Sequence, residues 1–402
     1  MLLLPECFAG DGRGITVKVC AVTTWPPHRD GVALYSSDLY RQIAKLVDVV
    51  IVANTLTQRE STESCEKKDK AVLRCWRRGP WFLFDIFRSV FKTRAHAVHL
   101  QHGWLLYGGC ISSIFFPVLL LFFRLSRKPC VVTIHTVIRK DAQLYKNSVV
   151  NFLARMAVMF VLKGIVKFSD SVIVHNPLMI EIIQKDYGTK VDKIAIIPHG
   201  VKSACNPEEV QKEKEINIMS LGFLRKGKGI GYLIEGFEKF LEICPDAKLI
   251  IVGGSHAHDK KDQSERFRHL LTPRTQKQVL FTGFVDEKRL EQLIWNSDII
   301  VLQSTEPYYV EASGALAAVA DYGKPVVCSK VPKFQSELRS EEHYLAVASS
   351  DSTELAQALA LLMRNEELRN RLGENLREEM KNRRWSTVAA EHIKLYEHLL
   401  KS

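Results

Sequence analysis

The sequence predicts an α/β protein of two domains, each a parallel β-sheet with helices on both faces. Apolar, strand-like segments alternate with helix-like segments along the chain, which is the pattern of such sheets. The 402 residues are enough for two domains that each bury a core, and a polar stretch at 202–215 interrupts the alternation. We therefore expect an N-terminal domain over 1–200, a linker over 201–214, a C-terminal domain over 215–380, and a last helix over 381–402 that can pack back on the first domain.

Each half of the chain contributes its own strands. In the first half, short apolar runs predict strands over 15–23, 49–53, 71–76, 97–101, 130–135, 171–175 and 193–198. Longer segments between them predict helices over 33–46, 104–125, 149–167 and 178–187. In the second half we expect strands near 216–221, 248–252, 278–282, 299–303 and 325–329, with helices from about residue 353 to the end. The sequence shows no internal repeat at a fixed period, which excludes solenoids and propellers.

The composition is that of an ordinary globular protein. Hydrophobic residues make up 46% and charged residues 25%, which excludes a wholly disordered chain and a polytopic membrane protein. The nine cysteines form no C-x-x-C pair and no His/Cys cluster, so we expect reduced thiols rather than a disulfide scaffold or a zinc site. The N-terminal M-L-L-L-P-E-C is too short and too polar for a signal peptide, and we expect a cytoplasmic protein.

Positive charge is concentrated in the first half. Residues 1–200 hold 27 Lys and Arg against 15 Asp and Glu, 201–402 hold 29 against 30, and 67–167 alone hold 18 against 3. Such a field attracts an anionic lipid surface, a nucleic acid or an acidic substrate, although a merely soluble basic face has the same composition. Because no helix-turn-helix, zinc-finger or RNP pattern accompanies the charge, we expect no nucleic-acid partner.

The same region holds nineteen consecutive uncharged residues, Leu105 to Phe123. Their length reaches the threshold for a membrane span, but two glycines, two serines and Pro117 interrupt the run and it lies between two expected strands. Three interpretations remain open: a buried or partly buried helix, which we prefer, a helix dipping into one leaflet, and a true span. The basic R-L-S-R-K that follows favours the interfacial helix if any face is exposed.

The segment 304–330 carries the strongest functional signal. Its order S-T-E-P-Y-Y-V-E-A-S-G-A-L places Glu311, Ser313 and Gly314 at the start of a small-residue helix. Free N–H groups and the dipole at a helix start bind anions, and glycine lets a phosphate approach the backbone closely. A carboxylate there would repel a bare phosphate, so we expect Glu311 to hold hydroxyl groups of a sugar attached to the phosphate. A plain helix start with Glu311 solvated or capping is the alternative.

Other loops also follow expected strands, where open parallel sheets bind their ligands. After the first strand, D-G-V-A-L-Y opens a helix at Gly31, and after 216–221 the basic loop L-G-F-L-R-K-G-K-G leads into another helix. His135 ends the apolar strand C-V-V-T-I-H, while His102 and His199 end two more strands and are candidates to contact an acceptor or the hinge. Simple turns and structural histidines are the alternative interpretations of these positions.

Together these segments resemble family 4 glycosyltransferases. The resemblance rests on E-A-S-G-A-L followed by G-K-P-V-V, on L-G-F-L-R-K-G-K-G-I, on F-T-G-F-V-D-E-K-R-L and on W-N-S-D-I-I-V-L-Q-S. It covers about residues 15–400 and is specific over 215–330. It implies the GT-B architecture, two Rossmann-like domains with parallel sheets facing across a cleft, and retaining transfer of a hexose from a UDP- or GDP-linked sugar. It also implies that no cofactor and no metal are needed, and the chain contains no D-x-D.

The family's functional positions can be transferred one residue at a time. The resemblance implies that Arg225 and Lys228, with backbone N–H groups of 313–316, stabilise the departing diphosphate. It further implies that Glu311 orients sugar hydroxyls and that His135 supports the sugar from the opposite wall. The nucleotide-sugar site then comprises Gly31, Gly222, Arg225, Lys228, Gly283, Phe284, Val285, Glu311, Ser313, Gly314, Ala315 and Leu316. The backbone of 283–285 is the implied base site.

The chain departs from the family pattern at four places. Asp30 stands where the family usually has a glycine, Phe223 occupies the commonest place of the arginine, and Thr136 replaces an acid. The second glutamate, which in the family holds the ribose, is missing from 318–320, where the sequence reads Ala-Val-Ala. We interpret that loss as an altered ribose contact rather than as loss of activity.

The charge and the apolar run of the first half favour a lipid-linked acceptor or a membrane-surface glycan at the cytoplasmic face, with an anionic membrane surface as a partner. Two other functions remain open. A sugar-nucleotide epimerase has the same two-domain shape and would release an altered sugar from the donor alone. A binding module that has lost catalysis would bind the nucleotide sugar without turnover, and the missing glutamate makes it conceivable.

Overall fold

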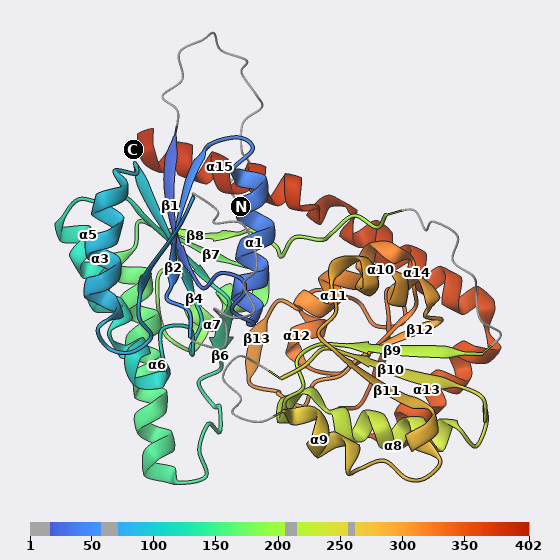
Figure 1. Cartoon of the computed structure of the whole chain (residues 1–402). Coiled ribbons are helices and arrows are strands. Elements are labelled where there is room, and N and C mark those ends of the chain that lie inside the picture. The colour runs from blue at the N-terminus through green and yellow to red at the C-terminus, as the bar shows by residue number, and fades with distance from the viewer. Residues whose placement is uncertain (1–16, 58–70, 206–214, 256–261, 402) are drawn as a thin grey trace.

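The computed structural model describes residues 17–57, 71–205, 215–255 and 262–401. Within them two α/β domains lie side by side, each with a parallel sheet (Figure 1), which confirms the predicted fold class. The expected linker lies largely outside the described residues, as does the N-terminal stretch that we compared with a signal peptide.

The first domain is built on a seven-stranded parallel sheet with the strand order β3-β2-β1-β4-β5-β7-β8. Its strands are β1 (Lys18–Thr23), β2 (Asp48–Asn54), β3 (Val72–Trp76), β4 (Ala97–His102), β5 (Cys130–Ile134), β7 (Ser171–Val174) and β8 (Ile194–Ile196). Its helices are α1 (Gly31–Ile43), α3 (Phe82–Thr93), α4 (Cys110–Ile114), α5 (Phe116–Leu125), α6 (Ser148–Phe168) and α7 (Pro177–Lys185). One core cluster lies between the sheet and α3, α5, α6 and α7, and another between the opposite face and α1.

The second domain repeats this plan with a six-stranded parallel sheet, ordered β11-β10-β9-β12-β14-β15. Its strands are β9 (Asn217–Leu221), β10 (Lys248–Val252), β11 (Val279–Gly283), β12 (Ile299–Leu302), β14 (Val326–Ser329) and β15 (Leu345–Val347). Its helices are α8 (Ile230–Phe240), α9 (Gln263–Arg268), α10 (Glu287–Asn296), α11 (Gly314–Val319), α12 (Pro332–Gln335), α13 (Ser352–Arg364) and α14 (Glu366–Met380). Apolar side chains again fill both faces of the sheet.

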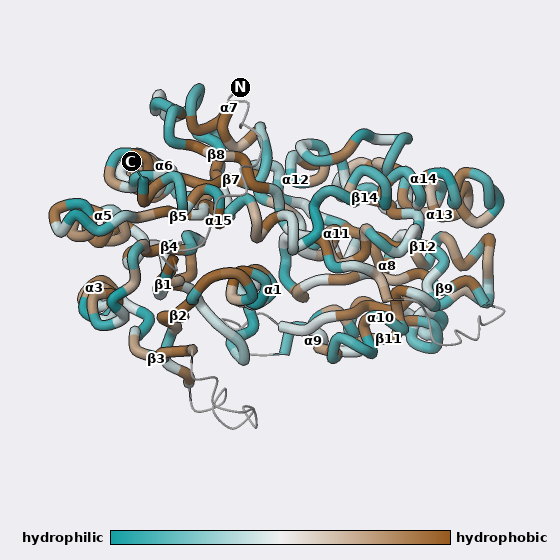
Figure 2. The backbone as a smooth tube through the Cα atoms, turned by 90° about the horizontal axis from the view of Figure 1, so that it is seen from above, coloured by the Kyte–Doolittle hydropathy of each residue, from teal (hydrophilic) through white to brown (hydrophobic). Residues whose placement is uncertain are grey.

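Two connections fix the domains to each other. The short strands β6 (Thr136–Ile138) and β13 (Tyr309–Glu311) come from different domains and pair antiparallel as a two-stranded sheet. The last helix, α15 (Trp385–Lys401), leaves the second domain and runs back over the first, as Figures 1 and 2 show. There it joins α1 and the first sheet in one core cluster, to which Trp385 and Tyr396 contribute.

Polar residues at the helix starts explain where several helices begin. Asp30 caps α1 by accepting a hydrogen bond from the Ala33 N–H, and Asn147 caps α6 by accepting from the N–H groups of Val149 and Val150. Such side chains satisfy backbone donors that have no partner within the helix, which favours a helix start at the following residue.

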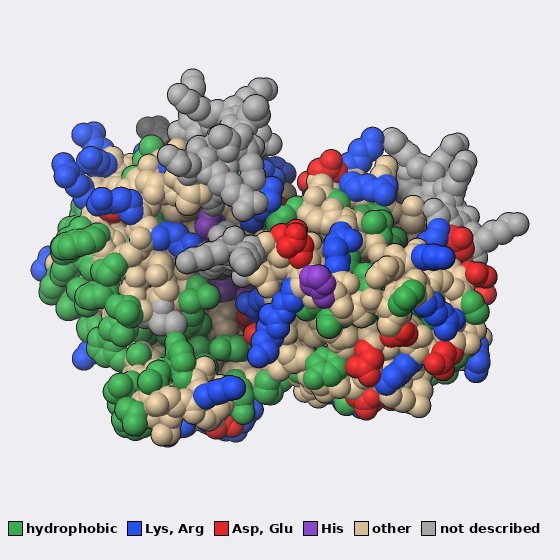
Figure 3. All heavy atoms as spheres, turned by 60° about the horizontal axis from the view of Figure 1, so that its bottom comes forward, with side chains coloured by type: hydrophobic (Ala, Val, Ile, Leu, Met, Phe, Trp, Pro, Cys, Tyr) green, Lys and Arg blue, Asp and Glu red, His purple; other side chains and the backbone are tan. Residues whose placement is uncertain are grey.

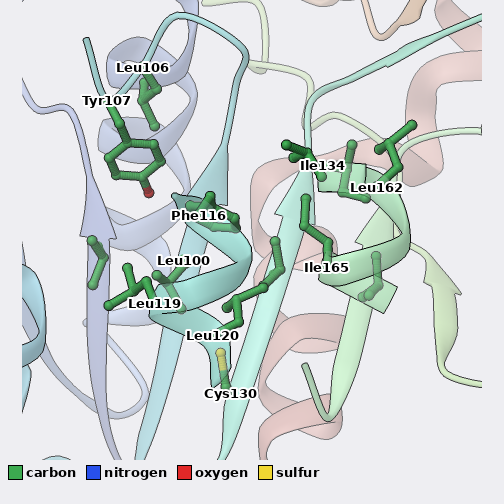
Figure 4. Packing of buried hydrophobic residues seen from close by; sticks show 14 of the residues in the cluster. Leu100, Leu106, Tyr107, Phe116, Leu119, Leu120, Cys130, Ile134, Leu162 and Ile165 are labelled. Atoms are coloured by element: carbon green, nitrogen blue, oxygen red, sulfur yellow. The ribbon is translucent and has the colours of Figure 1, made fainter. Parts of the chain in front are cut away.

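The helix predicted over 104–125 is wrong in one respect. The chain forms two shorter helices, α4 and α5, and the first begins only at Cys110 because Gly108 and Gly109 adopt the left-handed backbone with φ of 117° and 113°. The two helices are divided at Phe115, just before Pro117, which has no backbone N–H to donate. A side chain at Gly108 would also lie 2.5 Å from the backbone nitrogen of Gly79. Helix α5 is then a core helix: Figure 4 shows its Phe116, Leu119 and Leu120 packed among the buried side chains of the first domain. The part of the apolar run that forms α5 is therefore largely buried in the core, whereas Leu105, Ile111, Ile114 and Phe115 are exposed. With ten residues, α5 is too short to span a membrane.

Other elements were not predicted from the sequence. The helices α3, α9, α10 and α12 and the strands β6, β13 and β15 are absent from the expected set. Both strands of the small sheet between the domains have only three residues. Segments of that length are too short to show a periodicity, so their pairing depends on the packing of the two domains.

The contact between Gly200 and Trp385 offers a test of how α15 holds the first domain. An added Cβ at Gly200 would overlap the Trp385 indole, so Gly200→Ala should lower the free energy of unfolding by about 1–3 kcal/mol. Gly31→Ala is the matched control for stability, because nothing lies within 4 Å of its added Cβ. Urea unfolding of both variants measures the effect, and equal stability of Gly200→Ala and wild type would contradict the role of this contact.

Candidate functional site

Glu311 lies where the two domains meet. It ends β13 and stands opposite Thr136 of β6, whose hydroxyl donates a hydrogen bond of 3.0 Å to one carboxylate oxygen of Glu311. The other oxygen lies 2.6 Å from the Lys333 ammonium, which α12 delivers from the carboxyl end of β14. The carboxylate is thus held from both domains at once, by Thr136 of the first domain and by Lys333 of the second.

The charges around Glu311 keep it ionised. Burial alone would raise the pKa of this carboxyl, but the charges of Lys333, Lys228 and Arg225 outweigh burial and lower the pKa to about 2. Lys333 is nearly buried, with 8% of its side chain exposed. Lys333 was not among the predicted residues, although a lysine in the first turn after a buried strand was an available signal.

The loop that follows β9 brings Lys228 and Arg225 to the same region. The chain turns at Gly222 and at Gly229, with φ of 147° and 64°, and Lys226–Lys228 form a single 3-10 turn between them. Lys228 lines a small pocket with Gly222 and Phe223. Burial and then the charge of Lys333 hold the pKa of Lys228 well below its usual range, against the opposing charge of Glu311.

Arg225 already has a carboxylate partner. Its guanidinium lies 3.1 Å from Glu306, and the side chain of Glu306 covers Gly227 so closely that a Cβ there would overlap it. Arg225 was among the predicted residues but Glu306 was not, although the charged turn S-T-E-P contains Glu306. Together, three cations and two carboxylates converge beside the 3-10 turn, so cations are in excess by one.

The start of α11 is only partly available to an anion. The Ser313 hydroxyl caps the helix by accepting from the Leu316 N–H at 3.3 Å, and the Ser313 N–H is directed at the Glu337 carboxylate. Within the described residues, the N–H groups of Gly314 and Ala315 are the ones left without an acceptor, as expected at the first turn of a helix. Of the four expected N–H groups, the structure therefore leaves two free.

His135 follows β5, and its ring is held within the first domain. Its Nε2 lies 2.8 Å from the Gln101 side-chain oxygen and its Nδ1 lies 3.2 Å from Nε2 of His175. The Tyr35 ring packs edge-on at 4.7 Å, and the Tyr35 hydroxyl is buried without a hydrogen-bond partner in the described part of the chain. Burial, and after it the charge of His175, keeps the pKa of His135 well below its usual range, so the ring is neutral near pH 7.

A buried chain of hydrogen bonds connects His135 to α15. Gln101 donates a hydrogen bond of 2.7 Å to the Tyr40 hydroxyl. The Tyr40 hydroxyl lies 2.9 Å from Nδ1 of His99, and the same Nδ1 lies 2.6 Å from the Tyr396 hydroxyl. Helix α15 therefore supports, through Tyr396, the Gln101 side chain that orients His135. None of these partners was predicted, because they come from three elements far apart in the sequence.

The other strand-end histidines have different surroundings. His102 is fully buried, 4.8 Å from the Phe116 ring, and neither of its ring nitrogens has a partner in the described residues. It is a core residue and does not face the cleft, contrary to our expectation. His199 does approach the site, since its Nε2 would be 3.6 Å from a Cβ added to Gly314.

The remaining predicted positions lie around the same strand ends. Gly31 opens α1 with open space above it, but the buried carboxylate of Asp30 caps this helix start. Gly283, with φ of 68°, ends β11 and accepts a hydrogen bond from the Gly253 N–H. Phe284 is exposed over Gly254, where it stacks against the Arg29 guanidinium of the first domain at 4.6 Å. Val285 packs at the edge of the adjoining core cluster.

The position of the missing second glutamate is accounted for by packing. Val319, eight residues after Glu311, is fully buried in the core of the second domain. The side chain there supports α11 instead of reaching the cleft.

Among the described residues, no three His, Cys, Asp or Glu side chains are grouped to hold a metal ion.

Removing the Glu311 charge should change how stability depends on pH. Because its folded-state pKa is lowered from 4.5 to about 2, the carboxylate stabilises the fold above pH 4.5, and this contribution is lost as the pH falls towards 2. Glu311→Gln should therefore cost about 2–3 kcal/mol near pH 7 and flatten the decline in that acid range. Thermal unfolding from pH 7 to pH 2 measures it. The exposed Glu242→Gln is the control, and an unchanged pH profile for Glu311→Gln would contradict the ion pairs described above.

Comparison with known proteins matches both domains. The model of "Glycosyltransferase Family 4" matches residues 29–204, and that of "Glycosyl transferases group 1" matches residues 203–379. A phosphatidyl-myo-inositol mannosyltransferase of Mycobacterium leprae is 28% identical over 42% of this chain and 43% of its own length. A mannosylfructose-phosphate synthase of Agrobacterium fabrum is 27% identical, over 50% of this chain and 47% of that protein. The chain spans about half the length of the curated relatives it matches.

Solved structures match the whole fold. Sucrose-phosphate synthase from Thermosynechococcus elongatus superposes with a TM-score of 0.73 at 18% identity, covering 96% of this chain and 99% of that one. Anabaena HepE in complex with UDP-glucose gives 0.72 at 16% identity, with 95% and 99% covered. The two family models together extend over nearly all of both domains, and the neighbours share their arrangement. The chain is therefore a member of glycosyltransferase family 4 with the GT-B fold.

Proposed function

We propose that the protein is a retaining glycosyltransferase that moves a hexose from a UDP- or GDP-linked sugar to an acceptor glycan or lipid-linked sugar. The observation that carries the proposal is the convergence of Lys228, Arg225 and Lys333 on Glu311 at the contact between the two domains. A site with cations in excess fits a diphosphate, and a carboxylate beside it fits sugar hydroxyls. That HepE was solved with UDP-glucose supports a nucleotide-sugar donor.

The cations would act on the leaving group. Breaking the bond between the sugar and the diphosphate puts negative charge on the departing phosphate, and preorganised cations in a site with little water stabilise that charge strongly. Lys228 is the best placed, since burial and neighbouring cations destabilise its own charge and an anion would relieve this. Arg225 would exchange Glu306 for a phosphate, and the free N–H groups of Gly314 and Ala315 would add to the site.

Glu311 and His135 would hold the sugar. Glu311 stays ionised and accepts hydrogen bonds, which suits sugar hydroxyls, while Lys333 and Thr136 fix its orientation. His135, neutral and held by Gln101, would form the opposite wall. We propose no covalent nucleophile and no bound metal, because the charge that a metal would supply is available from these side chains. Orientation and leaving-group electrostatics are then the main sources of rate.

The acceptor proposal draws on the first domain. The positive charge of this domain is suited to an anionic membrane surface. Some of the relatives are named as phosphatidyl-myo-inositol mannosyltransferases, and phosphatidyl-myo-inositol is a lipid. We propose a lipid-linked acceptor or a membrane-surface glycan, reached at the cytoplasmic face.

Lys228→Ala tests the catalytic proposal. Loss of Lys228, the best placed of the three cations, should lower turnover by about 10²- to 10³-fold, and the fold should stay intact. Lys226→Ala, in the same turn but exposed, is the matched control and should keep most activity. Transfer of labelled sugar to an acceptor in a membrane extract measures the rate. Wild-type turnover in Lys228→Ala would contradict the proposed role of Lys228 in the transfer.

A thermal-shift panel identifies the donor. UDP, GDP, ADP and their sugars are added to the whole chain, and the true donor should raise the unfolding temperature in proportion to the logarithm of its excess over Kd. The response should be lost in Lys228→Ala. Stabilisation by a nucleotide sugar without transfer to any acceptor would favour a non-catalytic binding module, and an altered sugar released from the donor alone would favour an epimerase.

A further inference from the structure

Helix α6 has two apolar faces, of which one is exposed. Among the described helices it is the only one long and apolar enough to cross a membrane, yet part of it is buried in the first domain. Its buried face includes Val158, Val161, Leu162 and Ile165. The opposite face presents Val149, Phe152, Leu153, Met156 and Phe160 to solvent, at the spacing of one helix stripe. Phe152 and Leu153 are 61% and 60% exposed.

The exposed stripe changes from apolar to basic along the helix. One turn beyond Phe160 the same stripe continues with Lys163 and then Lys167, both exposed. The apolar part from 149 to 160 measures about 16 Å at 1.5 Å per residue. Apolar side chains at one end and lysines at the other are the arrangement of a helix that enters the lipid boundary and leaves its ammonium groups at the headgroups.

Neighbouring elements extend this surface. Ile111, Ile114 and Phe115 are exposed on and just after α4, which packs against α6, and Trp81 and Phe84 are exposed at the start of α3. Figure 3 shows hydrophobic side chains gathered over the first domain, with Lys and Arg side chains at the margin, whereas the second domain mixes both charge signs on this face. Exposed apolar surface of this kind marks an interaction site.

We propose that this surface, defined as the exposed apolar residues of α6, α4 and the start of α3, docks into one leaflet of an anionic lipid bilayer. Charge decides between lipid and another protein: residues 77–167 hold 14 Lys and Arg against two Asp. Both acids are already paired, Asp85 with Arg77 and Asp141 with Arg139. A second copy of the chain would bring the same positive charge to the contact and be repelled, whereas anionic headgroups are attracted.

The surface is connected to the active site by a short piece of chain. β6, whose Thr136 holds Glu311, leads directly into the segment before α6, and in Figure 1 the first half of α6 projects below the body of the first domain. Docking there would hold the mouth between the domains close to the membrane. The meaning for a lipid-linked acceptor rests on the proposed function, whereas the docking surface itself does not.

Flotation of the whole chain with lipid vesicles tests the proposal. Wild type should float with vesicles containing phosphatidylglycerol and hardly with pure phosphatidylcholine, and the binding should weaken at high salt. Phe152→Glu with Leu153→Glu should lower the partition coefficient by about 100-fold or more, since two side chains lose their burial in lipid. Both side chains are exposed, so the fold should survive. Leu361→Glu, exposed on α13 of the second domain, is the matched control and should bind as wild type.

Charge is tested separately. Lys163→Gln with Lys167→Gln should weaken binding to phosphatidylglycerol vesicles by about 30-fold and reduce its salt dependence, at roughly fivefold for each lysine near the surface. Equal flotation of the Phe152/Leu153 variant and wild type would overturn the proposal. So would wild-type binding that ignores lipid charge, or a dimer in sedimentation that the same variant abolishes. The donor thermal shift is measured in parallel; its absence in every variant would count against the proposed function and leave the docking surface standing.

Discussion

The Glu311 carboxylate is shared by the two domains, and the arrangement of the site depends on it. One oxygen accepts from Thr136 of the first domain and the other pairs with Lys333 of the second. The strands that carry Glu311 and Thr136 have three residues each, too few to be stable alone. They pair because both domains present them at the same edge, and α15 holds the domains together by packing on the first. The interactions that join β6 to β13 therefore also fix the position of the Glu311 carboxylate.

Without a ligand, the candidate site has more positive than negative side chains. Arg225, Lys228 and Lys333 exceed Glu306 and Glu311 by one positive charge, in surroundings that desolvate several of these groups. Buried charge without full compensation costs stability, which is why such groups are rare outside functional sites. The favourable packing of the two hydrophobic cores offsets this unfavourable free energy. A diphosphate would supply the missing negative charge, and the same excess that destabilises the free site would then favour binding.

Sequence reasoning predicted the parts of the site that lie within one segment. The resemblance implied Arg225 and Lys228 because both lie in one glycine-rich loop, and Glu311, Ser313 and Gly314 were predicted because they lie together at one helix start. Lys333, Glu306 and Gln101 were missed because their partners lie on other elements, and a lysine after a strand or an acid in a turn does not reveal such a contact. The strands of both sheets, except the short β15, were found because buried parallel strands are continuous apolar runs. The helix over 104–125 failed where two glycines take a backbone that other residues avoid.

The two apolar helices of the first domain show why composition alone cannot locate the proposed docking surface. Helix α5 is the more evident candidate in the sequence, yet the sheet and α6 enclose it, and Phe116, Leu119 and Leu120 have no exposed area. Helix α6 has apolar residues on both faces, and the first domain can cover only one. Which face is left depends on where α5 packs, and α5 packs closely because Gly164 of α6 leaves room for Pro117. The burial of one apolar helix thus requires the exposure of the other, and that exposed face carries the lysines.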